Sequence, residues 1–124
     1  MSDTLDYATF NDLRDRMSAK FDIIVETYIK DSEKYLGNIS NNLSESPMNL
    51  DAIIEDAHSL KSTSALLGLL KASEVAKALE YKGKELRENQ DFLNTDLLES
   101  LKDTLEIEIK EACEVLACEL QKTA

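Results

Sequence analysis

Apolar residues recur along most of this chain with the three-and-four spacing that is typical of amphipathic helices. The clearest case lies in residues 21–44, where one polar step, Ser32, interrupts an apolar stripe formed by Phe21, Ile24, Tyr28, Tyr35, Ile39 and Leu43. Only three glycines and one proline occur, so the residues that punctuate strands and hairpins are nearly absent. The pattern therefore predicts an all-α protein.

The chain breaks this pattern where its single proline lies. Pro47 disfavours helical geometry at Ser46, which predicts a turn over residues 44–49. We expect the next helix to run from Leu50 to Gly68, because glycine readily adopts the left-handed conformation found just beyond many helix ends. Its inner face should consist of Ile53, Ala57, Leu60, Ser64 and Leu67.

Two more long helices are expected after a connection at residues 69–71. The first should end near Asn89 and bury Ala72, Val75, Ala76, Leu79 and Leu86, with Gly83 on the same side where helices can approach closely. The last should be capped by Asn94 or Thr95 and bury Leu98, Leu101, Leu105, Ile109, Ala112, Leu116 and Leu120. A weaker amphipathic helix is expected near residues 4–17, and its buried positions should be Leu5, Phe10, Leu13 and Met17.

Short connections between long helices favour antiparallel neighbours. The predicted fold is therefore an antiparallel up-and-down four-helix bundle with a short additional N-terminal helix. The 124 residues fit one compact domain, residues 1–124, and 43% apolar with 31% charged residues suit a folded, well-hydrated chain.

The charge and the absence of certain segments exclude several classes of function. With 25 acidic and 14 basic residues the net charge is -11, so the phosphate backbone of a nucleic acid would be repelled. No apolar run approaches the roughly 20 residues that cross a bilayer, and the polar start lacks the regions of a signal peptide, so we expect a cytoplasmic protein without membrane insertion. The two cysteines, Cys113 and Cys118, lack the CxxC spacing of redox and zinc motifs, so we expect both to be reduced thiols.

His58 is the only histidine, so any imidazole chemistry must use it. At about 100° per residue, His58 points well away from the inner stripe and should reach solvent. Lys61 and Ser62 lie one turn further on the same face, and a lysine there can offset the charge of a phosphoryl group on the ring. From spacing alone, an ordinary solvated histidine and a phosphotransfer residue both remain open, whereas a metal site lacks further ligands.

Small and apolar residues surround His58 on the same helix. Ser62 and Ala65 are small and leave the imidazole accessible to another protein. Ile54, Ala65 and Leu69 project toward the same broad side, where Ile54 and Leu69 can either pack against a neighbouring segment or form part of a docking surface.

The stretch from Ala57 to Gly68, AHSLKSTSALLG, resembles the signature H-x-L-K-G-S-[SA]-x-x-x-G of histidine-containing phosphotransfer (HPt) domains. The matching positions are His58, Leu60, Lys61, Ser64 and Gly68, with Thr63 replacing the usual serine. Ser62 stands where the family usually has glycine, which predicts slower transfer or a narrower choice of partner. Leu79-Glu80 and residues 21–28 also resemble family patterns, so the likeness covers roughly residues 13–90.

This resemblance implies a phosphoryl carrier in a multistep two-component phosphorelay. His58 would accept the phosphoryl group from a receiver aspartate and pass it to another, and Lys61 would stabilise its charge. The partner-docking residues would be Ile54, Ser62, Ala65 and Leu69, and Gly68 would end the helix. The expected partners are response-regulator receiver domains and a hybrid sensor histidine kinase.

The resemblance also implies which groups the chain does not supply. No intrinsic cofactor or metal is expected, since Mg²⁺ would be held by the partner receiver domain. The chain lacks a Walker-type loop and kinase glycine boxes, so it should not phosphorylate itself with ATP, and a transient carrier should be a monomer. The alternative is a non-catalytic helical adaptor that binds receiver or kinase domains, and a third hypothesis is oligomerisation through the final helix.

Overall fold

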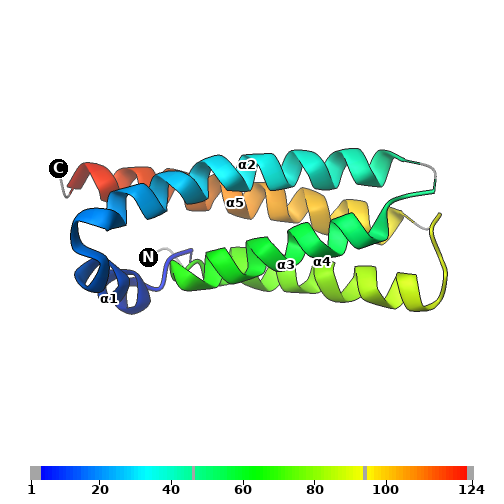
Figure 1. Ribbon diagram of the computed structural model, residues 1–124, viewed down its shortest axis with the longest axis horizontal. Helices are drawn as coiled ribbons and strands as arrows, with labels where there is room; N and C mark the ends of the chain where they lie inside the picture. The colour runs from blue at the N-terminus through cyan, green and yellow to red at the C-terminus, as the bar shows by residue number, and fades with distance from the viewer. Residues whose placement is uncertain (1–3, 46, 94, 123–124) are drawn as a thin grey trace.

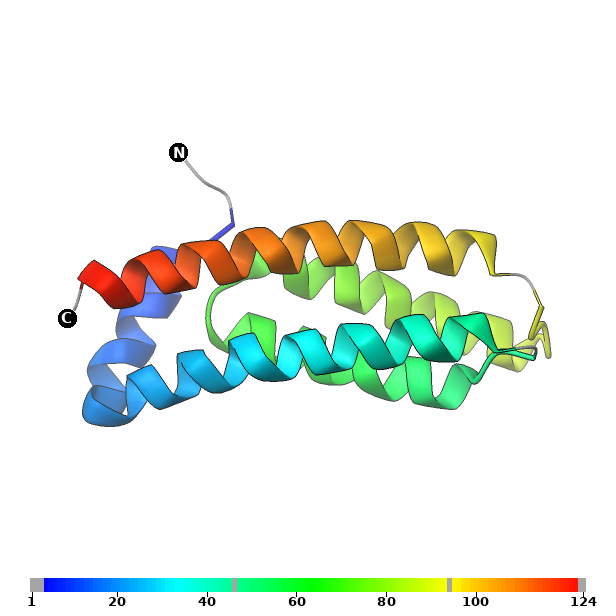
Figure 2. The ribbon, with the colours of Figure 1, turned by 90° about the horizontal axis from the view of Figure 1, so that it is seen from above.

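The chain folds as a bundle of long helices in the computed structural model, which describes residues 4–45, 47–93 and 95–122. The elements are α1 (Tyr7–Met17), a 3₁₀ turn (Ser18–Lys20), α2 (Phe21–Ser44), α3 (Leu50–Leu66), α4 (Leu70–Glu88) and α5 (Asp96–Lys122). Helices α2 to α5 run up and down along the long axis, and α1 lies across one end (Figures 1 and 2). The predicted fold is confirmed.

The ends of the helices follow local capping chemistry. The side chain of Asn49 accepts a hydrogen bond from the backbone N–H of Ala52 at 3.2 Å and caps α3. Helix α3 ends at Leu66, and Gly68 follows with a φ of +80°. Helix α4 already begins at Leu70, so the predicted connection was too long at its C-terminal side. Asn94, one of the two expected caps of α5, lies outside the described residues.

The core lies between α2, α3, α4 and α5. The five inner-face residues predicted for α3 are all buried, which confirms that face. On α2, Val25 is buried while Ile24 is only partly covered. The buried face of α2 is therefore rotated slightly from the predicted stripe. The hydroxyls of Tyr28 and Ser64 are hydrogen-bonded at 2.8 Å, so the one polar residue on the inner face of α3 has a partner.

The N-terminal segment closes the end of the bundle where α3 turns into α4. The backbone N–H of Asp6 donates to the carbonyl of Gly68 at 2.7 Å, and the rings of Phe10 and Phe21 meet edge to face with centroids 5.1 Å apart. These contacts tie α1 to both the α3–α4 turn and the start of α2, and so help to set how α3 and α4 lie against each other.

Two further predictions concern the surface of the helices. Among the residues that the structure describes, no helix is long and apolar enough to cross a membrane. Cys113 is partly buried and Cys118 is exposed, and both are free cysteines.

Candidate functional site

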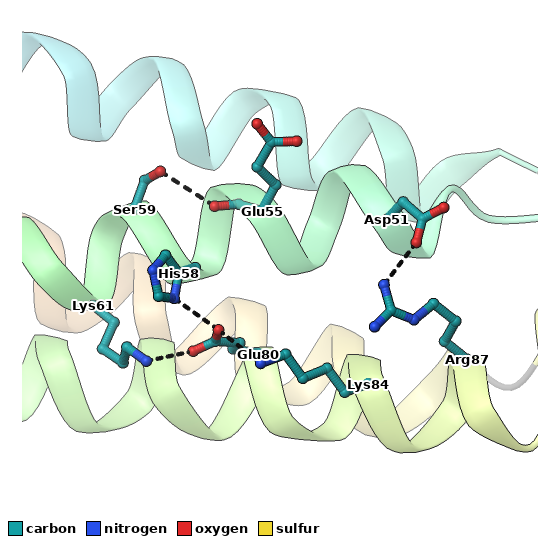
Figure 3. A network of polar contacts seen from close by, with 8 residues as sticks. All are labelled: Asp51, Glu55, His58, Ser59, Lys61, Glu80, Lys84 and Arg87. Atoms are coloured by element: carbon teal, nitrogen blue, oxygen red, sulfur yellow. Dashed lines mark hydrogen bonds and ion pairs between the residues drawn. The ribbon is translucent and has the colours of Figure 1, made fainter.

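The candidate site lies where α3 and α4 pack side by side, and its centre is a buried carboxylate, Glu80 (Figure 3). The Glu80 side chain is only 3% exposed. Its Oε2 lies 2.8 Å from Nδ1 of His58 and 3.2 Å from Nζ of Lys84, and its Oε1 lies 2.8 Å from Nζ of Lys61. One carboxylate of α4 therefore joins three nitrogen-bearing side chains from both helices.

Helical spacing places these groups. His58 and Lys61 are three residues apart on α3, and Glu80 and Lys84 are four apart on α4, so each pair lies on one face of its helix. Burial of Ala57 on the inner face turns His58 outward, and its side chain is 58% exposed. The prediction that His58 reaches solvent is confirmed.

The charge of Glu80 is set by two opposing effects. Burial alone would raise the pKa of this carboxyl group, but hydrogen bonds from Lys61, His58 and Lys84 outweigh it and lower the pKa to about 2. Glu80 is therefore ionised at neutral pH and can only accept hydrogen bonds.

The ionised Glu80 selects one form of the neutral imidazole. Because a carboxylate cannot donate, the bond between Glu80 and Nδ1 of His58 requires the ring proton to be on Nδ1. The other ring nitrogen, Nε2, then keeps its lone pair. The arrangement thus combines an exposed nucleophilic nitrogen with two nearby ammonium groups, which suits the transfer of an anionic group.

Comparison with known proteins identifies the family. The family model of the Hpt domain matches residues 23–117. The chain belongs to the Hpt domain family. Among solved structures, it is similar to histidine-containing phosphotransfer protein B (HptB) from Pseudomonas aeruginosa PAO1, with a TM-score of 0.84, 21% identity and 98% of each chain covered. At this identity the likeness is one of fold. No curated protein matches the chain.

Membership of the Hpt family supports the role of a carrier in a phosphotransfer relay. Hpt domains interact with receiver domains and kinases in such relays. Within the described ranges, no group of three or more His, Cys, Asp or Glu side chains could hold a metal ion.

Two of the expected docking residues of this Hpt domain are buried. Ile54 is 7% exposed and packs over Gly83, where an added Cβ would lie 2.8 Å from its Cγ1. Leu69 is fully buried in the α3–α4 turn, and its N–H donates to the carbonyl of Ser64 at 2.8 Å. Both side chains are packing residues, so the docking prediction is wrong for Ile54 and Leu69.

The other two expected docking residues lie on the surface. Ser62 and Ala65 are exposed on α3, and their docking role stays a prediction. Further along α3, Leu66 is 51% exposed, and Ile23 of α2 is 63% exposed. Both line an apolar groove between α2 and α3, together with Thr27 and Thr63.

The sequence analysis assigned no role to Glu80 or Lys84. It named Glu80 only as half of the Leu79-Glu80 pair that resembles an HPt family pattern. A usable signal was present, because Glu80 follows one turn after Ala76 beside the buried Leu79, at the edge of an otherwise apolar face. A carboxylate at such a place needs partners, and Lys84 one turn on is one of them.

Proposed function

We propose that His58 is the phosphoryl acceptor of this Hpt domain, which receives the group from the aspartate of one receiver domain and passes it to another. One observation carries the proposal: the exposed imidazole is held through Nδ1 by the ionised Glu80, which leaves Nε2 with a lone pair toward solvent. An ordinary surface histidine has no such buried carboxylate behind it.

The transfer is a displacement at phosphorus. The Nε2 lone pair of His58 attacks the aspartyl phosphate in line, an N–P bond forms, and the bond between phosphorus and the aspartate oxygen breaks, so the carboxylate leaves with the electron pair. The ring gains positive charge, which Glu80 offsets from 2.8 Å away. Attack by the carboxylate of a second receiver reverses the step and frees His58.

Two lysines lie close enough to act on the phosphoryl group. Lys61 is one turn beyond His58, and its ammonium can move from Glu80 toward a phosphoryl oxygen, where a charge-assisted bond is strong. Lys84 keeps Glu80 ionised and in place. The receiver would supply Mg²⁺ together with its aspartate, so no metal ligand is required from this chain.

Docking would use the side of His58 that faces α2. Ser62 and Ala65 leave room for the partner, and Leu66 and Ile23 offer apolar surface beside them. We propose that a hybrid sensor histidine kinase supplies the phosphoryl group upstream.

A carrier that must release each partner suits a modest interface and a monomeric state. We keep the cytoplasmic location expected from the sequence as part of the proposal.

Incubation with a radiolabelled phosphorylated receiver domain tests the acceptor. The wild type should gain an acid-labile, base-stable label, whereas His58→Gln should gain none at unchanged helicity. Glu55→Gln is the matched control, since Glu55 is exposed one turn earlier on α3 and its variant should be labelled normally. Labelling of His58→Gln would refute the assignment, and wild-type binding without label would favour the adaptor hypothesis.

Lys61→Ala tests the role of the lysine. Loss of one charge-assisted bond to the phosphoryl group should slow transfer about 10-fold at saturating receiver. Because Lys61 also pairs with the buried Glu80, the variant should be less stable, so transfer is measured at a temperature where circular dichroism shows it fully folded. An unchanged transfer rate would remove Lys61 from the mechanism.

A further inference from the structure

An exposed tyrosine on α4 has three lysine ammonium groups around its ring. Tyr81 is 54% exposed. From its ring centroid, Nζ of Lys77 lies at 5.5 Å, Nζ of Lys84 at 5.8 Å and Nζ of Lys61 at 5.9 Å. These distances allow cation–π attraction. Tyr81 therefore holds three cations together on the α4 side of His58.

The positive charge in this cluster is only partly neutralised. Lys61 and Lys84 share the single negative charge of Glu80. In the described part of the chain, Lys77 is exposed and forms no ion pair with a carboxylate. By contrast, Lys82 pairs with Glu85 at 3.0 Å further along α4. A surplus of positive charge thus lies beside the site.

This surplus is unusual in a chain with a net charge of -11. Helix α4 carries five basic and four acidic residues, whereas α5 carries eight acidic and three basic residues. An acidic partner would be repelled by α5 and attracted to the cluster around Tyr81. The local field therefore favours one direction of approach to His58.

We propose that Lys77, Tyr81 and Lys84, here called the α4 patch, form a docking patch for the acidic face of a receiver domain. The inference rests on the proposed function, because it takes a receiver as the partner. A receiver must bring an aspartyl phosphate to Nε2 of His58, so the part of its surface nearest the α4 patch is anionic. Tyrosine is also a residue type that protein interfaces favour.

The α4 patch is separate from the apolar groove on the α2 side of His58. The groove offers apolar contact through Ile23 and Leu66, whereas the patch offers charge. Charged residues at the rim of an interface act mainly on the association rate and on its dependence on salt. The patch should therefore steer and orient the receiver, and the groove should retain it.

The first test compares two lysines that differ only in place. With a receiver domain that labels the wild type, stopped-flow association should be about 2- to 5-fold slower for Lys77→Gln at low ionic strength, and this difference should shrink as salt is added. Lys110→Gln removes the same charge from an exposed lysine of α5 and should associate like the wild type. Equal slowing by both variants would overturn the patch, because net charge alone would then explain the effect.

The second test concerns the ring of Tyr81. Tyr81→Leu should slow association about 2- to 5-fold, since the lysines lose the aromatic face that gathers them, and Tyr81→Phe should restore the wild-type rate. Wild-type association by Tyr81→Leu would overturn the role of the ring, as would slowing by Tyr81→Phe equal to that by Tyr81→Leu. Labelling of His58→Gln by the same receiver would contradict His58 as acceptor, and these association rates would still decide the patch.

Discussion

Replacement of Glu80 by glutamine removes the negative charge that joins His58 and Lys61 of α3 to α4. Glutamine keeps the size of the side chain and one acceptor oxygen, but it cannot balance Lys61, Lys84 and a charged form of the His58 ring. The contacts at stake are two of 2.8 Å and one of 3.2 Å. The variant therefore isolates the contribution of charge from that of packing.

The size and the sign of the effect follow from the pKa of Glu80. A pKa of about 2 in place of the ordinary 4.5 corresponds to about 3 kcal/mol in favour of the ionised form in the folded chain. Lys61 and Lys84 can turn partly to water when the charge is lost, so the expected loss at pH 7 is about 1–3 kcal/mol. Because the folded pKa is lowered, this stabilisation is present above about pH 4.5 and disappears as the pH falls toward 2.

Urea unfolding between pH 7 and pH 2.5, followed by circular dichroism, measures this effect as the difference between wild type and Glu80→Gln. Glu85→Gln is the control, since it makes the same change on α4 at a side chain that is 60% exposed and pairs with the neighbouring Lys82, where about 0.5 kcal/mol or less is expected. If Glu80→Gln were as stable as Glu85→Gln at pH 7, or if its deficit did not shrink in acid, the reasoning would be refuted.

Three other substitutions test the scaffold by the same urea titration. Gly68→Ala should lose about 1–3 kcal/mol, because Gly68 has a φ of +80° and an added Cβ would lie 2.7 Å from the carbonyl oxygen of Asp6; wild-type stability would contradict this. Tyr28→Phe should lose about 1–2 kcal/mol, because the buried Ser64 hydroxyl loses its partner, and a neutral result would mean that Ser64 rebonds elsewhere. Burial raises the pKa of Asp56, so Asp56→Asn should be more stable than the wild type at pH 7 and equal to it near pH 3; a deficit at pH 7 would reverse the sign.

The fold could be predicted from the sequence because its helices are strongly amphipathic. The spacing of residues such as Ile53 and Leu60 was enough to predict the inner face of α3. On α2, Val25 is buried in place of the predicted Ile24 because the two residues lie near opposite edges of the predicted apolar stripe. Packing of α2 against α3 and α5 decides which of them is covered. Periodicity gives the face of a helix, but not its last ~25° of rotation, a quarter of one residue step.

The site could be predicted only in part, because half of it depends on which helices meet. The outward direction of His58 followed from α3 alone. The bond to Glu80 joins residues 22 positions apart and depends on how α3 and α4 pack. The same limit explains Ile54, which lies off the inner stripe but is covered because Gly83 leaves room for it on α4.

The central claim is that Nε2 of His58 carries the phosphoryl group while Nδ1 faces Glu80. Since His58 is the only histidine in the sequence, a chain with ¹⁵N-labelled histidine gives the NMR spectrum of one imidazole, recorded before and after incubation with a phosphorylated receiver. We expect the neutral ring to carry its proton on Nδ1 before transfer, and coupling to phosphorus at Nε2 afterwards. Phosphorus coupled to Nδ1, or an imidazole spectrum unchanged while the protein gains label, would contradict the claim.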